Sequence, residues 1–218
     1  VMSVNGSIDM SWVNTYGIDT VMISYGSGSQ TGYAMADLLF GYENPSAKLA
    51  DTITETYEEH PTVDSFGYHT YKELGLDWKA NHSTFGENDP ISLYEEGIYE
   101  GYRYFDTFGK DVLYPFGSGL SYSDFTFTDM SVEANEEEKS ITVTATVNNV
   151  TEDETIPEGK EVMEVYVSAP EGKLEQPYQK LVDFEKSEKL ASGESQTISI
   201  DIPLDEFASY DEEQAAYI

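Results

Sequence analysis

The sequence predicts two architectures in succession: strand–helix units of an α/β domain built on a parallel sheet, and then an all-β sandwich of immunoglobulin type. Before residue 124, short apolar runs alternate with segments of helical spacing. After it, apolar and polar residues alternate with period two between Gly-, Pro- and Glu-rich turns. A stretch of little periodicity lies between them. We therefore expect three parts: residues 1–55 (α/β), 56–122 (a packed interdomain loop region) and 123–218 (the β-sandwich).

In residues 1–55 the sequence predicts two strands, each followed by a helix. The runs "VMSV" (1–4) and "DTVMISY" (19–25) are apolar and short, as buried strands are. Helical spacing follows each of them, in residues 7–16 and 27–41, with Ser29 as a possible cap of the second helix and Gly41 as its end. Strand, helix, strand and helix in this order are typical of a parallel α/β sheet.

In residues 123–218 the sequence predicts antiparallel strands. In "KSITVTATVNNV" (139–150) the apolar residues are expected on one face and the polar residues on the other. The apolar set is Ile141, Val143, Ala145 and Val147, and the polar set is Thr142, Thr144, Thr146 and Asn148. Three further runs share this alternation: residues 161–170, 178–187 and 195–203. Such runs between turn signals favour a β-sandwich.

Composition excludes several classes of function. The chain has 42 Asp and Glu against 11 Lys and Arg, a formal charge of −31, which repels phosphate backbones and anionic lipids. We therefore expect neither nucleic acid nor a membrane as partner. There is no cysteine, and no apolar run approaches the ~20 residues of a membrane-spanning helix. We expect a soluble protein, either secreted or cytoplasmic, whose N-terminal segment is missing from this sequence. The excess of acidic residues is consistent with solubility or with adaptation to salt.

Histidines and other scattered residues give weak signals. His60, His69 and His82 lie among Asp and Glu, but no paired spacing fixes two ligands on one element, so we expect surface histidines and neither a metal nor a cofactor. Asn81 and Asn149 begin N-x-S/T triplets, which matter only in a secretory host. Trp78 suits stacking on a sugar face, although packing is the favoured role.

Three motifs together resemble glycoside hydrolase family 3, the β-glucosidase family. They occur in the family's order and span almost the whole chain. They are "AMADLLFGYENPSAKL" (34–49), "EGIYEGYRYF" (96–105) and "LYPFGSGLSYSDF" (113–125). The resemblance implies that the chain holds the C-terminal part of the family's α/β sandwich domain and its fibronectin type III-like domain.

The resemblance also implies a chemistry whose groups are not in this chain. Family 3 enzymes use a retaining mechanism with two carboxylates. The nucleophile is an aspartate on a (β/α)₈ barrel, which needs ~250 residues, and the acid/base glutamate precedes the segment seen here. We therefore expect no catalytic residue in this chain, and its substrate-binding residues are unknown.

The function that the resemblance implies is that of the non-catalytic half of a retaining β-glycosidase, with β-glucosidase favoured. This half would brace the catalytic barrel and the active-site rim, with the barrel in the same or another chain and a β-glucoside or oligosaccharide as substrate. The alternative is a stand-alone carbohydrate-associated or structural module. The family's last sandwich strand is expected to be missing after "EEQAAYI". Residues 28–32 and Ala47 also depart from the family pattern.

The chain's single arginine, Arg103, lies between two tyrosines at the expected joint between domains. Five residues are predicted to have a structural interdomain role: Arg103, Tyr102, Tyr104, Tyr114 and Phe116. A guanidinium stacks on aromatic rings and carries five donors, so Arg103 is expected to stack on a neighbouring tyrosine and to hold loop carbonyls or Asp106. It is expected to act as a clamp and not as a sugar ligand.

Overall fold

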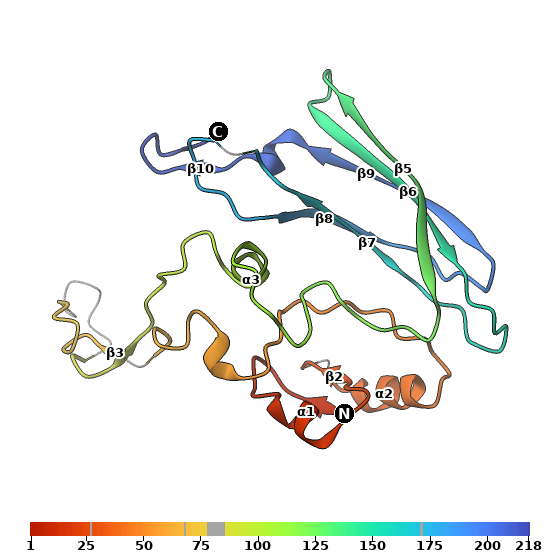
Figure 1. The fold of residues 1–218 in the computed structure, drawn as a ribbon, viewed down its shortest axis with the longest axis horizontal. Helices are drawn as coiled ribbons and strands as arrows, with labels where there is room; N and C mark the ends of the chain where they lie inside the picture. The colour runs from red at the N-terminus through yellow and green to blue at the C-terminus, as the bar shows by residue number, and fades with distance from the viewer. Residues whose placement is uncertain (27, 68, 78–85, 171) are drawn as a thin grey trace.

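A computed structural model describes residues 1–26, 28–67, 69–77, 86–170 and 172–218. It shows α/β elements at the N-terminal end followed by an all-β sandwich, as the sequence predicts (Figure 1). The sandwich lies to one side of the α/β elements, and helix α3 lies between the two in this view.

The α/β part contains one parallel strand pair and two helices. Its elements are β1 (Met2–Ser3), α1 (Ser11–Tyr16), β2 (Ile23–Ser24) and α2 (Thr31–Leu39). β1 pairs with β2 in parallel, with Met2 opposite Ile23. All four elements lie within the predicted segments but are shorter. Helix α2 follows Gln30 without a side-chain cap, so Ser29 is not its cap.

The middle region has more regular structure than expected. It contains η1 (Tyr57–Glu59), β3 (His69–Thr70), β4 (Pro90–Ile91) and α3 (Tyr102–Thr107). A capping box of Thr56 and Glu59 begins η1. Helix α3 has no side-chain cap and follows Gly101, whose φ of 56° is accessible to glycine. Its Phe105 is buried, so α3 is held by packing.

The sandwich is made of two antiparallel sheets. The larger has the order β5–β6–β9, and the smaller pairs β7 with β8. The strands are β5 (Phe125–Asn135), β6 (Ser140–Asn149), β7 (Val162–Val167), β8 (Lys180–Lys186) and β9 (Ser195–Pro203). η2 (Leu204–Phe207) follows, and then a short hairpin of β10 (Tyr210–Asp211) and β11 (Ala216–Tyr217).

The two faces of β6 confirm the predicted alternation. Ala145 and Val147 are buried in a cluster that also contains Met163, Leu190, Ile198, Ile200 and Ile202. On the outer face, threonines of β6 bond to polar side chains of β9: Thr142 to Asp201, Thr144 to Ser199 and Thr146 to Thr197. The apolar face therefore builds the core, while hydroxyl pairs across the strands stabilise the outer face.

Candidate functional site

Helix α3 is joined to the sandwich through Tyr102. The backbone N–H of Leu181, in β8, donates a hydrogen bond of 2.7 Å to the Tyr102 hydroxyl. The Tyr102 ring stacks on Phe116, with ring centroids 4.5 Å apart, and meets the edge of Tyr166 in β7 at 6.0 Å. One tyrosine thus contacts the loop before the sandwich and both strands of its smaller sheet.

Two further residues of α3 bind the segment that leads into β8. Gln179 Nε2 donates to Asp106 Oδ2 at 3.0 Å, and the Tyr178 N–H donates to Thr107 Oγ1 at 2.9 Å. Asp106 lies one turn after Tyr102, so the two side chains share a face of the helix. That face of α3 is the one turned to the sandwich.

Asn44 forms a second joint, between the loop after α2 and the start of the sandwich. Its Nδ2 donates to Ser123 Oγ at 2.7 Å and to the Pro157 carbonyl at 3.0 Å. Its Oδ1 accepts from Ser121 Oγ at 2.8 Å and from the Tyr122 N–H at 2.9 Å. Only 8% of Asn44 is exposed. All four hydrogen-bonding positions of this amide are therefore filled.

A largely buried ion pair also joins the loop after α2 to the sandwich. Lys48 Nζ is 2.7 Å from Glu161 Oε1, with side-chain exposures of 20% and 12%. The backbones also approach closely here, because a Cβ added to Gly119 would lie 2.5 Å from the Ala47 carbonyl oxygen. The ion pair therefore joins the α/β part to the sandwich, and the close backbone contact joins it to the segment that leads into the sandwich.

Tyr166 has an altered acidity at the same joint. Burial raises its pKa, and its hydroxyl donates to Glu164 Oε2 at 2.8 Å, which raises the pKa further. Gly117, with a φ of 76°, lies against this pair, and a Cβ there would meet the Tyr166 hydroxyl at 2.9 Å. The phenol therefore remains neutral and acts as a donor.

The other residues predicted at the joint lie in different surroundings. The Tyr104 ring contacts Phe105 and Phe108. Tyr114 forms backbone hydrogen bonds with Ile53, which tie the middle region to the α/β part. The structural interdomain role expected of all five residues stays a prediction. Sequence reasoning did not select Asn44, Lys48 or Gln179 for the joint, although the first two lie inside a motif that it recognised.

Arg103 lies over Tyr102, with its guanidinium carbon 5.9 Å from the ring centroid. Among the described residues its side chain has no hydrogen bond or ion pair with the loop carbonyls or with Asp106, which accepts from Gln179 instead. The guanidinium lines a groove of about 510 Å³ beside α3. The contact with the Tyr102 ring is the one expected for Arg103. The hydrogen bonds expected for its guanidinium are not found among the described residues.

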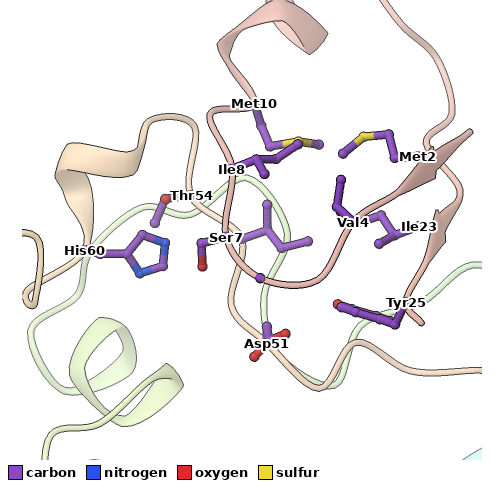
Figure 2. A pocket seen from close by; sticks show the side chains of 12 residues that line it. Met2, Val4, Ser7, Ile8, Met10, Ile23, Tyr25, Asp51, Thr54 and His60 are labelled. Atoms are coloured by element: carbon purple, nitrogen blue, oxygen red, sulfur yellow. The ribbon is translucent and has the colours of Figure 1, made fainter. Parts of the chain in front are cut away.

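The groove lies between the α/β loops and α3. Its lining includes Asp51, Thr52, His60, Ser65, Phe66, Tyr94, Glu96, Glu100, Tyr102, Arg103, Phe105 and Phe116. A smaller cavity of about 20 Å³, large enough for one water molecule, shares three of its residues: Ser7, Asp51 and His60. Figure 2 shows His60 and Asp51 at one side of this cavity, with the apolar side chains of Met2, Ile8 and Met10 at another.

Two of the three histidines, His60 and His69, lie in the described part of the chain, at different places in the middle region. His60 meets the edge of Phe105 at 5.8 Å, and its pKa is lowered by burial. His69 is in β3. His82, Asn81 and Trp78 lie outside the described residues. Within the described ranges, no group of three or more His, Cys, Asp or Glu is arranged to hold a metal ion, and no helix has the length and apolar character needed to cross a membrane.

Comparisons with known proteins agree with this architecture. The "Glycosyl hydrolase family 3 C-terminal domain" matches residues 1–122, and the "Fibronectin type III-like domain" matches residues 161–218. A β-glucosidase of Ruminococcus albus is 34% identical over 213 residues, covering 97% of this chain and 20% of that protein. β-Glucosidase A of Butyrivibrio fibrisolvens is 36% identical over 229 residues, covering 97% of this chain and 25% of that protein.

Solved structures of β-glucosidases also match nearly the whole of this chain. A β-glucosidase from Paenibacillus barengoltzii superposes with a TM-score of 0.76 at 36% identity, covering 94% of this chain and 20% of that one. β-Glucosidase 3B from Thermotoga neapolitana, in complex with glucose, superposes with a TM-score of 0.70 at 35% identity, covering 86% and 23%. This chain thus spans a fifth to a quarter of these relatives. It belongs to glycosyl hydrolase family 3, within the C-terminal part of that family's sequence.

Proposed function

We propose that this chain is a non-catalytic part of a retaining family 3 β-glycosidase, most closely of the β-glucosidase type, which hydrolyses terminal β-linked sugars. The observation that carries the proposal is the match of nearly the whole chain to a fifth to a quarter of several β-glucosidases. The partners in this proposal are the catalytic barrel of the same enzyme and a β-glucoside or oligosaccharide substrate.

In this proposal the chain is a brace. Residues 1–55 belong to the α/β domain, 56–122 form the joint region and 123–218 form the sandwich. Tyr102 and Phe116 hold the joint together with Asn44 and the Lys48–Glu161 pair. These contacts support the proposal because a buried amide with all its hydrogen bonds made holds the segments that it joins in one relative position. A brace of this kind keeps the active-site rim in position against the barrel.

No carboxylate of this chain is assigned a catalytic role in the proposal. A retaining mechanism needs a nucleophile and an acid/base on either side of one anomeric carbon. The family's barrel needs ~250 residues, more than the whole of this chain. The two reacting groups therefore belong to other parts of the enzyme.

Segment replacement tests the proposal. The segment of Butyrivibrio fibrisolvens β-glucosidase A that matches this chain is exchanged for the chain itself. We expect the hybrid to hydrolyse an aryl β-glucoside, while the enzyme without the segment and this chain alone do not. A folded hybrid without activity would overturn the bracing role. Turnover by the chain alone would overturn the assignment of the catalytic groups elsewhere.

Two glycine variants of the hybrid test the joint. Gly119→Val places side-chain atoms against the Ala47 carbonyl and should lower the temperature at which activity is lost. Gly32→Ala is the control, because nothing lies within 4 Å of the added Cβ. The alternative function, a stand-alone module, predicts instead that the joint can be loosened without any effect on hydrolysis.

A further inference from the structure

The groove beside α3 has exposed aromatic rings on its rim. Phe66 and Tyr94 are 64% and 91% exposed. The backbone N–H of Leu93 donates to the Ser65 carbonyl at 2.9 Å. The two segments that carry Tyr94 and Phe66 are therefore adjacent. Phe105, which is buried, and the stacked pair of Tyr102 and Phe116 add further aromatic lining. The groove therefore has exposed rings at its rim and buried or stacked rings in its interior.

Two polar groups of residues that line the groove have no partner among the described residues. The guanidinium of Arg103 has no hydrogen bond or ion pair with any described residue. Thr52 is 6% exposed, and its hydroxyl is the one buried side-chain polar atom without a partner in the described ranges. A buried hydroxyl left without a hydrogen bond is unfavourable. Both residues belong to the lining of the groove, but the Thr52 hydroxyl is buried below its surface, so the guanidinium of Arg103 is the group that a polar ligand in the groove would pair with.

The charges of the groove select the kind of ligand. Asp51, Glu96 and Glu100 line it together with Arg103, so acceptors outnumber the single fixed cation. Neither glutamate forms an ion pair with Arg103. An anionic ligand would be repelled by three carboxylates in a protein of formal charge −31. A neutral molecule with many hydroxyls can donate to carboxylates and accept from a guanidinium at the same time.

We propose that this groove binds a neutral saccharide. The C–H face of a pyranose packs on an aromatic ring, which Tyr94 or Phe66 supplies at the rim. Sugar hydroxyls accept from Arg103 and donate to Glu96, Glu100 or Asp51. The volume of about 510 Å³ lies in the range of small-molecule sites, about 300–1,000 Å³. Arg103 then has two functions. Its guanidinium packs on the Tyr102 ring, and this cation–π contact orients the N–H donors that bind the sugar.

This site goes beyond the bracing role and changes the expectation for Arg103. The sequence favoured a clamp without sugar contact, but the expected partners of the guanidinium are engaged elsewhere or out of reach. The site uses only residues of this chain, so it can be tested without the catalytic barrel. Failure of sugar binding leaves the segment replacement unaffected, and failure of the segment replacement leaves sugar binding unaffected.

Direct titration of the 218-residue chain tests the proposal. Cellobiose and xylobiose are added while tyrosine fluorescence and calorimetric heat are followed, with sodium sulfate as an anionic probe. We expect saturable binding of a disaccharide with a dissociation constant of about 1 mM or below, and none of sulfate. Tyr94→Ala should weaken binding about tenfold through loss of the ring face. Arg103→Gln should weaken it at least as much, with an unchanged circular dichroism spectrum.

Tyr33→Ala is the matched control. Tyr33 is 74% exposed on α2 and does not line the groove, so its loss should leave sugar affinity unchanged. Absence of saturable binding would overturn the proposal, as would binding that neither Tyr94→Ala nor Arg103→Gln weakens. A third outcome concerns the hybrid enzyme: if Tyr94→Cys in it reacts with a thiol reagent only after denaturation, another part of the enzyme covers the groove and the proposal is wrong.

Discussion

Asn44 Nδ2 donates a hydrogen bond of 2.7 Å to Ser123 Oγ across 79 residues of sequence, and both side chains are buried. Three further hydrogen bonds fill the remaining positions of the amide. A buried, fully satisfied amide is strongly directional, because any shift of one partner leaves a polar group unpaired. The relative position of the α/β loop and the sandwich therefore depends on this side chain.

Replacing Asn44 by aspartate should destabilise the chain. Asn44→Asp keeps the shape and both acceptor contacts but removes the two donated bonds, and it places a carboxylate against the Pro157 carbonyl. We expect the free energy of unfolding to fall by about 3 kcal/mol, measured by urea denaturation. Asn5→Asp is the control, since Asn5 is exposed and only its Oδ1 is used, accepting from the Gly26 N–H. Equal effects of the two substitutions would contradict the role of Asn44.

The sequence predicted the sandwich strands well and the joint poorly. Strict alternation over residues 139–150 is a local signal, and β6 follows it in both faces. Helix α3 gave no such signal. Its six residues contain three aromatic rings and an arginine between Gly101 and Gly109, and its helicity comes from Phe105 and Tyr102 packing against other segments. Contacts between distant segments have no period in the sequence.

The candidate groove could be predicted only in part. Tyr94, Glu96 and Arg103 lie in or beside a motif that sequence reasoning recognised. Phe66 comes from a segment without a motif signal, and only the fold brings it to the same groove as Arg103. The sequence also does not tell whether Asp106, the expected acceptor, pairs with Arg103 or with Gln179; among the described residues it accepts from Gln179.

The Lys48–Glu161 pair should be sensitive to removal of one partner. Lys48→Met leaves the Glu161 carboxylate, 12% exposed, without its cation. We expect the free energy of unfolding to fall by about 3 kcal/mol, and to recover in part in the double variant Lys48→Met, Glu161→Leu. A double-mutant cycle measures the coupling.

The Lys189–Glu43 pair serves as the matched comparison. It has the same distance, 2.7 Å, but its side chains are 47% and 52% exposed. Because solvent screens such a pair, Lys189→Met should lower the free energy of unfolding much less than Lys48→Met does. If both lysine variants lose equal stability, burial is not the reason for the strength of the Lys48 pair.

Salt should stabilise this chain. A formal charge of −31 opposes the compact state through self-repulsion, and dissolved ions screen it over a Debye length of about 10 Å at 0.1 M ionic strength. We expect the urea midpoint to rise between low and about 1 M sodium chloride. An equal osmolality of a neutral solute is the control, because it does not screen charge. No difference between salt and neutral solute would show that self-repulsion is unimportant here.

Asp211 should make the β10–β11 hairpin sensitive to acid. Its buried carboxylate accepts from Gln214 Nε2 at 2.7 Å and from Lys173 Nζ at 3.1 Å, and these hydrogen bonds lower its pKa below the ordinary 3.8. A lowered pKa contributes stability that is fully present above 3.8 and lost as pH falls through the folded-state value. The stability lost in Asp211→Asn should therefore be largest near pH 6 and should shrink below about pH 3. Unfolding at both values measures this, with Glu212→Gln, an exposed neighbour, as control. A difference between wild type and Asp211→Asn that does not change with pH would contradict the role of the carboxylate charge.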